Sequence, residues 1–198
     1  MIFGLFDLMN IDDDSFCVID KWPTAKGFDA SDAAGASTGE PVANIWPADA
    51  RCQMSSKFGG MVLADFVSNT LQLFIVHKRV REVMERVNRG PTEYLPLSIF
   101  NHKQRLASKD YFVANPLGTH DVLDLKKSDI EWSGKDVVGV DKFVLDPVKM
   151  KRAPDFFRPQ ESPGSYFISK RIATELQKLD PPNTNRNYLD GFDVPDVP

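Results

Sequence analysis

Apolar residues recur along this chain with two different periods, and together they predict an α+β fold. Most lie in short bursts bounded by turn residues, which is typical of strands. One segment instead has apolar residues at 76, 80, 83, 84 and 87, on one face of a helix that ends at Gly90. Strands that follow one another through turns favour a mixed, mainly antiparallel sheet with a few packed helices. The expected strands are 16–19, 73–76, 93–100 (where Pro96 indicates an edge or a bulge), 111–114, 122–125 and 137–140.

The stretch 154–179 carries the clearest local pattern. Its sequence is PDFFRPQESPGSYFISKRIATELQKL. An aromatic pair and Arg158 precede a turn rich in Pro, Ser and Gly, and a short apolar strand follows at 166–168. Ser169 then provides an N-cap for an amphipathic helix, which Asp180 and two prolines are expected to end. The apolar side chains of this stretch are expected to build the C-terminal part of the core.

An earlier segment repeats this pattern at an offset of 92 residues. FIVHKRV at 74–80 aligns with YFISKRI at 166–172, and the apolar positions of the two following helices also coincide. The fold is therefore expected to contain two similar strand-helix units, with His77 in the place of the capping Ser169. The Lys-Arg pair of each unit lies in the first helical turn, where the helix dipole disfavours cations. These bases are either solvated or in contact with a partner.

The first third of the chain has a different composition. Residues 23–44 are rich in Ala, Gly, Ser, Thr and Pro, which predicts a long surface loop or a flexible segment. We therefore expect an N-terminal segment at 1–66 that contains this loop, an α+β domain at 67–192 and a frayed tail at 193–198.

Charge is unevenly distributed, although the net charge of −4 is too small to predict nucleic-acid binding. Residues 1–66 carry 4 basic and 10 acidic side chains, whereas 67–115 carry 8 basic and 4 acidic ones. The acidic end either pairs with the basic middle or meets a basic partner. The chain shows neither a signal peptide nor an apolar run long enough for a membrane span, so a soluble, cytoplasmic protein is expected.

Motifs of catalysis and metal binding are missing from the sequence. The three histidines are scattered, and the chain contains no H-E-x-x-H, C-x-x-C pair, G-x-S-x-G, Walker loop or G-x-G-x-x-G. Cys17 and Cys52 are expected to be free thiols, with a single disulfide as the alternative. The run 12–14 is a solvated turn rather than a calcium loop, because it lacks the alternating oxygens, central Gly and terminal Glu of an EF-hand. We expect no catalytic residues, no metal and no cofactor.

A family resemblance extends over residues 65–192. It rests on a helix that ends before TEYLPLSIF, on YFVANPLGTHDVLDLKKSDIEW after it, and on the closing stretch followed by Gly191-Phe192. The most specific positions are Phe157-Arg158, the burst 166–169, and Asp124 with Ser128-Asp129. In these features the chain resembles the bacterial immunity proteins of polymorphic toxin systems grouped as immunity protein family eleven. It departs from their pattern at His77, where Ser is more usual, and at Pro181-Pro182.

The resemblance implies a non-enzymatic cytoplasmic protein that binds and neutralises a cognate toxin and so protects the producing cell. The toxin gene is expected beside this gene, often as an effector of contact-dependent or type VI secretion in interbacterial competition. An enzyme of unknown type and an adaptor or chaperone that loads an effector are the alternatives. If the toxin is a basic nuclease, candidate contact residues are Asp12, Asp13, Asp14, Asp129, Glu131 and Trp132.

Overall fold

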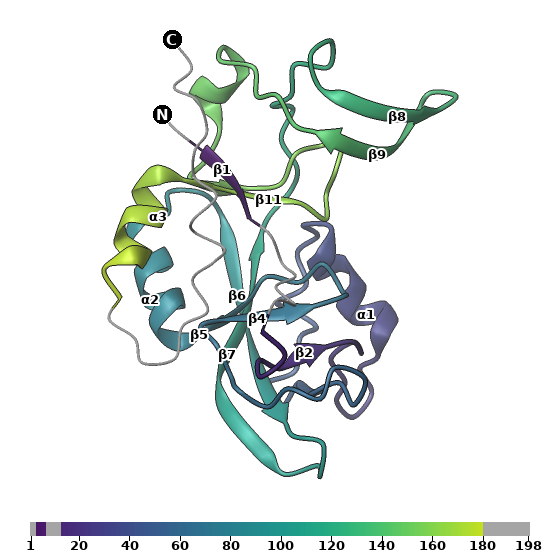
Figure 1. The fold of residues 1–198 in the computed structure, drawn as a ribbon, viewed down its shortest axis with the longest axis vertical. Coiled ribbons are helices and arrows are strands. Elements are labelled where there is room, and N and C mark those ends of the chain that lie inside the picture. Colours follow the sequence, from purple (N-terminus) through teal and green to yellow (C-terminus); the bar gives the residue numbers. More distant parts are fainter. Residues whose placement is uncertain (1–2, 7–12, 180–198) are drawn as a thin grey trace.

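A computed structural model describes residues 3–6 and 13–179 and has the predicted α+β fold (Figure 1). The described strands form a six-stranded sheet in the order β2-β4-β5-β7-β6-β3, a three-stranded sheet β1-β11-β10 and a hairpin β8-β9. Pairing in the main sheet is antiparallel except for β2 with β4 and β3 with β6. No helix in this described part is both long and apolar enough to cross a membrane.

The element bounds are as follows. The strands are β1 (Phe3–Phe6), β2 (Val18–Ile19), β3 (Arg51–Gln53), β4 (Phe66–Asn69), β5 (Ile75–His77), β6 (Thr92–Phe100), β7 (Leu106–Pro116), β8 (Asp129–Ser133), β9 (Asp136–Lys142), β10 (Phe156–Phe157) and β11 (Tyr166–Ser169). The helices are α1 (Ala30–Ala34), α2 (Lys78–Val87) and α3 (Lys170–Gln177), with 3₁₀ turns η1 (Gly35–Ser37) and η2 (Lys149–Arg152). The expected helix stop at 180–182 and the tail at 193–198 lie outside the described residues.

The first third of the chain contributes to the main core, and a part of the range 23–44, expected to be a surface loop or a flexible segment, is helical and buried. This range contains α1 and η1, in which Ala33 and Ala36 are fully buried. Asp29 caps α1 by accepting from the Ser31 amide at 2.8 Å, while Asp32 accepts from the Asp29 amide at 3.0 Å. Small side chains were read as having little to bury, yet they let this backbone approach the core closely. The boundary expected at residue 66 does not separate two sheets, because β2 and β3 precede it and pair with β4 and β6.

At Pro96, β6 is paired with β7 on one side only. The strand runs between β7 and β3, but β3 pairs only with Ser98–Phe100. The Pro96 carbonyl instead accepts from the Trp46 indole nitrogen at 2.8 Å, and the register with β7 shifts between Leu97 and Ile99. Both features that the proline predicted, a free edge and an irregular register, are therefore present close to it.

The strand expected at 122–125 does not form in the described structure. Val122 and Leu123 are buried, but Leu123 makes only an isolated bridge with Leu145. These side chains instead pack with Phe157 and Phe167 in a small core beneath the β8-β9 hairpin. The burial of this apolar segment was therefore predicted correctly, but the strand pairing expected for it was wrong.

The two strand-helix units are present, and in the structure each unit also includes a short strand that comes before it in the chain. Asp65 and Asp155 each precede a short strand whose residues pair with the strand leading into the helix, β4 with β5 and β10 with β11. The Asp65 carbonyl accepts from the His77 amide at 2.8 Å, and the Asp155 carbonyl accepts from the Ser169 amide at 2.7 Å. Each unit is thus a hairpin followed by a helix that is capped by the last strand residue.

The first-turn arginines of the two helices have equivalent partners. Arg79 pairs with the Asp65 carboxylate at 2.5 Å, and Arg171 pairs with the Asp155 carboxylate at 2.6 Å. Both aspartates are nearly fully buried, so each charge is held against the cation that follows it. These buried carboxylates offset the unfavourable position of a cation at a helix N-terminus. Both arginines stay partly exposed, and their ion pairs within the chain were not among the alternatives that the sequence suggested.

Equivalent positions of the two units contact each other, as in an approximate two-fold arrangement. The rings of Phe74 and Tyr166, 92 residues apart, have centroids 5.1 Å apart. A Cβ added at Gly164 would lie 2.4 Å from Cδ of Gln72, again 92 residues away, so only glycine permits this approach without a shift. Helices α2 and α3 lie side by side (Figure 1) and share one apolar cluster.

Arg158 connects this double unit to the first third of the chain. Its side chain has no exposed surface, and its guanidinium carbon lies 4.0 Å from the centre of the Tyr166 ring. No carboxylate of the described residues forms an ion pair with it. Its hydrogen-bond acceptors are the carbonyls of Ser37 (2.6 Å), Ala36 (2.7 Å) and Pro163 (2.6 Å), the Tyr166 hydroxyl (2.5 Å) and Asn115 Oδ1 (3.5 Å).

Candidate functional site

The β8-β9 hairpin projects from one end of the molecule, away from the main sheet (Figure 1). Neither strand has a second neighbour among the described strands, so most of its side chains are exposed. A two-stranded ribbon is marginally stable in water, and its conformation therefore depends on how its base is held.

The base of the hairpin is fixed to the small core beneath it. Ser128 Oγ accepts from the Val144 amide at 3.0 Å and donates to the Val144 carbonyl at 3.3 Å. The Asp124 amide donates to the same carbonyl at 2.8 Å. The Phe143 ring packs edge-on against Phe167 with centroids 5.5 Å apart. Asp124 and Ser128, two residues that carry the family resemblance, thus hold the hairpin in place.

The two faces of the hairpin differ in chemistry. Directly opposed residues share a face, and Ile130 opposes Val140 while Trp132 opposes Val137, which gives one apolar face. The other face carries the two β8 carboxylates: Asp129 opposes Lys142, and Glu131 opposes Gly139. Register shifts on either side of this stretch leave Val138 and Asp141 as extra residues in β9.

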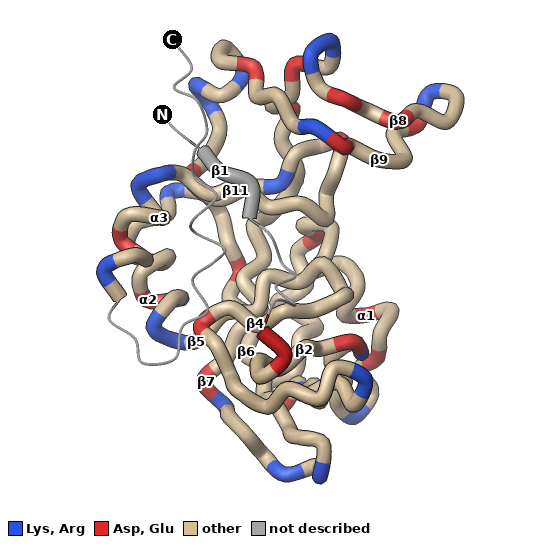
Figure 2. Tube along the Cα trace, in the orientation of Figure 1, with Lys and Arg blue, Asp and Glu red and all other residues tan. Residues whose placement is uncertain are grey.

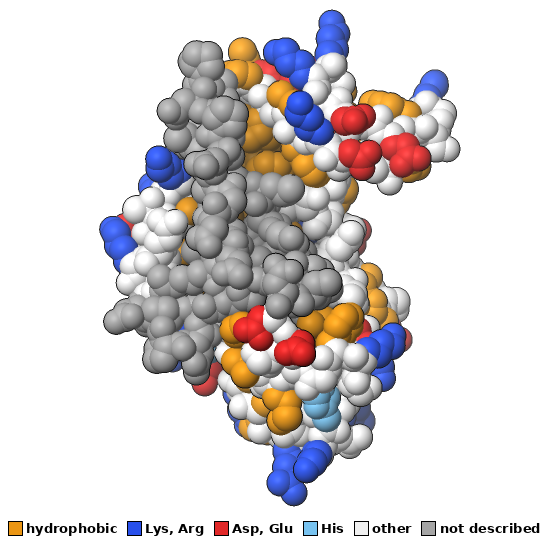
Figure 3. Space-filling model, in the orientation of Figure 1, with side chains coloured by type: hydrophobic (Ala, Val, Ile, Leu, Met, Phe, Trp, Pro, Cys, Tyr) orange, Lys and Arg blue, Asp and Glu red, His pale blue; other side chains and the backbone are white. Residues whose placement is uncertain are grey.

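Large apolar side chains are exposed on and beside the hairpin. Trp132 is 49% exposed and Val138 is 58% exposed, and Leu125 and Val148 near the base are also exposed. Figure 3 shows acidic and apolar side chains gathered on the hairpin, and the molecular outline is hollowed between it and the body below. Exposed aromatics beside charged groups are typical of protein-binding surfaces.

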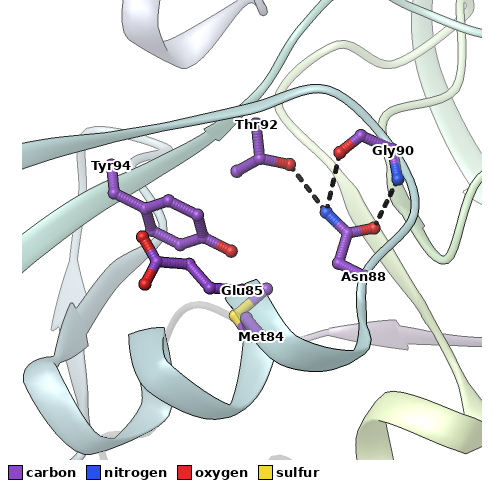
Figure 4. A pocket seen from close by; sticks show the side chains of 6 residues that line it. All are labelled: Met84, Glu85, Asn88, Gly90, Thr92 and Tyr94. Carbon is purple, nitrogen blue, oxygen red and sulfur yellow. Dashed lines mark hydrogen bonds between the residues drawn. The ribbon is translucent and has the colours of Figure 1, made fainter.

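A small open pocket lies at the end of α2, on another part of the molecule (Figure 4). It has a volume of about 250 Å³ and is lined by Met84, Glu85, Asn88, Gly90, Thr92 and Tyr94. The Asn88 amide is occupied by Gly90 and Thr92, at 3.1 and 2.9 Å. The buried Tyr94 hydroxyl has no hydrogen-bond partner among the described residues, and burial raises the pKa of Tyr94. No sequence pattern predicted this pocket, because the residues that line it come from the end of a helix and from alternate positions of a strand.

Comparison with known protein families shows to which family the chain is related. The model of an immunity protein family (Imm11) matches residues 20–197. The chain belongs to this immunity protein family. A comparison with curated proteins gave no match. The family match begins before β3 and α1, so the resemblance seen at 65–192 extends to the N-terminal elements of this immunity protein.

Membership indicates a function in toxin immunity and implies a toxin as partner. Immunity protein families are generally non-enzymatic. This immunity protein is thus expected to work through its surface, and the residues that matter for function are those available to a partner.

The structure separates the candidate contact residues of this immunity protein into two groups. Asp129, Glu131 and Trp132 all lie in β8, but the two acids are on the face opposite to the tryptophan. Asp13 and Asp14 precede β2, which lies toward the other end of the long axis (Figures 1 and 2). Asp12 lies outside the described residues. Whether either group contacts the toxin stays a prediction.

Asp13 has a local structural role in the immunity protein. Its carboxylate accepts from the Ser15 amide at 3.0 Å, and hydrogen bonding to Ser15 holds the pKa of Asp13 below its ordinary value. Such an Asx turn explains an aspartate at this position without a partner.

Burial shifts the pKa of two further titratable groups. Burial raises the pKa of Glu161 and lowers that of His120, but neither residue lines the pocket at the end of α2. Within residues 3–6 and 13–179, no group of three or more His, Cys, Asp or Glu side chains could hold a metal ion.

Cys17 and Cys52 are buried free thiols in the described structure and line the main apolar core. Burial raises the pKa of Cys17 to about 12, and burial also raises that of Cys52. Because the thiolate is the reactive form, we expect neither to react with iodoacetamide in the folded protein at pH 8. Both should react after unfolding in urea, as counted by mass spectrometry. Rapid labelling of either thiol without urea would contradict this burial.

Proposed function

We propose that this protein binds one cognate toxin directly in the cytoplasm and neutralises it, so that the producing cell is protected. The observation that carries the proposal is the match of an immunity protein family over residues 20–197. The toxin is the product of a neighbouring gene in a polymorphic toxin system, delivered by contact-dependent or type VI secretion during interbacterial competition.

The structure supports inhibition by binding. The projecting hairpin offers exposed apolar and charged side chains on a rigid base, which is what a protein-binding surface requires. The buried thiols are poorly placed to act as nucleophiles. Recognition of a toxin needs a surface with a few buried anchors and complementary charge rather than catalytic residues.

The test is co-expression in a bacterial host with the toxin encoded beside this gene. We expect growth to be restored and the two proteins to elute together on gel filtration. Continued killing, with no complex, would overturn the proposal. A complex that leaves toxicity intact would also overturn it and would assign effector loading instead.

A further inference from the structure

We infer that the β8-β9 hairpin is the element that recognises the toxin, and that it enters a cleft lined by basic side chains on that protein. The inference rests on the proposed function and names the surface and the chemistry of the partner. It follows from the shape of the hairpin, from its charges and from its exposed apolar residues.

The shape favours insertion over contact with a flat surface. Strands β8 and β9 project from the body with side chains of both faces available, while their base is held by Ser128, Val144 and Phe143. A ribbon whose base is already fixed loses less conformational freedom on binding than an unattached segment would, which favours affinity. Addition of a partner strand to the edge of β8 is disfavoured by its charged residues and by the register shifts.

The charges of the hairpin indicate a basic partner. It carries four carboxylates, at Asp129, Glu131, Asp136 and Asp141, against two bases, Lys135 and Lys142. None of these carboxylates belongs to an ion pair in the described part of the chain. Acidic side chains that have no internal cation attract a basic surface and accelerate encounter with it.

Two exposed apolar residues are suited to anchor the complex. Trp132 lies on the face opposite to Asp129 and Glu131, and Val138 is the extra residue at the bulge. Tryptophan is enriched among the residues that dominate binding energy, most of all where a pocket of the partner desolvates it. A cleft that receives both faces would bury Trp132 on one side and meet the two carboxylates on the other.

The other acidic candidate lacks these features. The carboxylate of Asp13 is engaged with the Ser15 amide, and Asp14 lies beside it in the same turn before β2. Asp110 is an exposed acid of β7 in the main sheet and belongs to neither group of candidate contacts, which makes it a matched control for charge reversal.

The experiment measures binding of full-length variants to the toxin encoded beside this gene, by surface plasmon resonance at two salt concentrations, together with protection in co-expression. Trp132→Ala is expected to weaken binding by about 30-fold or more, in the range of an interface hot spot. Asp129→Lys combined with Glu131→Lys is expected to slow association by about 10-fold and to reduce its salt dependence. Asp110→Lys should bind within about 3-fold of wild type.

A second variant of the hairpin, Val138→Lys, covers the case in which Trp132→Ala perturbs the hairpin itself. Charges on edge strands oppose aggregation, so a change of charge here can affect solubility as well as binding. Circular dichroism and gel filtration therefore check that each variant is folded and monodisperse. If all hairpin variants bind within 3-fold of wild type, the inference is overturned while the proposed function stands. If wild type neither binds nor protects, the proposed function fails first.

Discussion

Replacement of Arg158 by methionine is expected to lower the free energy of unfolding by about 3 to 5 kcal/mol, as for the loss of one partner from a buried charged network. The guanidinium is fully buried and donates to three backbone carbonyls and to the Tyr166 hydroxyl. Two of those carbonyls belong to Ala36 and Ser37, more than 100 residues earlier in the chain. Its loss would therefore separate η1 from the C-terminal unit.

The size of the effect follows from the acceptors that remain. A buried carbonyl without a donor costs about 1 to 3 kcal/mol, and the substitution leaves several such groups at once. Replacement of a buried ion pair by apolar residues can be neutral, but only when both partners are replaced. Here most partners are backbone atoms, which no substitution removes. The recovered cost of burying the guanidinium offsets part of the loss, because burial already lowers the pKa of Arg158 and so disfavours its charged form.

Urea unfolding followed by circular dichroism measures this change. Arg158→Lys should have an intermediate stability, because a lysine keeps the charge but cannot donate in the fork geometry of a guanidinium. Arg152→Met, at an exposed position of η2, is the matched control and should change stability by less than about 0.5 kcal/mol. An Arg158→Met protein as stable as this control would show that the network contributes nothing.

Local signals in the sequence predicted much of the fold. The helix 78–87 and the cap at Ser169 follow from periodicity and from hydrogen bonds within a few residues, so the sequence carries them directly. The burial of Arg158 could not be predicted from such local signals, because arginine is usually exposed and its hydrogen-bond acceptors are brought near only by the tertiary fold. The equivalence of Asp65 and Asp155 was not found in the sequence for another reason. The two aspartates are 90 residues apart, whereas the helices are offset by 92, so an alignment at a fixed offset does not pair them.

The candidate interface was predicted in part. Asp129, Glu131 and Trp132 were selected from residue type and the family resemblance, and the structure places all three on one exposed strand. Their distribution over two faces depends on strand alternation and on register, which the bulges in β9 obscure. Val138 was missed, although the consecutive valines of VVGV interrupt alternation and mark an extra residue.

Asp155→Asn is expected to destabilise the protein by about 1 to 2 kcal/mol at pH 7, because a buried carboxylate loses charge-assisted hydrogen bonds from two arginines that remain partly exposed to solvent. The carboxylate is 2% exposed and accepts from Arg171 at 2.6 Å, Ser169 Oγ at 2.9 Å and Arg89 Nε at 3.2 Å. It therefore holds the start of α3 and the turn after α2 together. Asparagine keeps the shape but removes the charge that both arginines require.

The effect of this substitution should depend on pH in a defined direction. Burial alone would raise the pKa of Asp155, but the hydrogen bonds from Ser169 and Arg89 and the charge of Arg171 hold it below 3.8, its ordinary value. A carboxyl whose pKa is lower in the folded state stabilises the protein above its unfolded pKa, and this contribution is lost as the pH falls through the folded pKa. The difference in the free energy of unfolding between wild type and Asp155→Asn should thus be the same at pH 7 and pH 5, and it should become smaller below pH 3.8. Urea titrations at pH 7, 5 and 3 measure it, with the exposed Asp14→Asn as control. A difference that stays constant down to pH 3 would show that folding does not lower the pKa of Asp155.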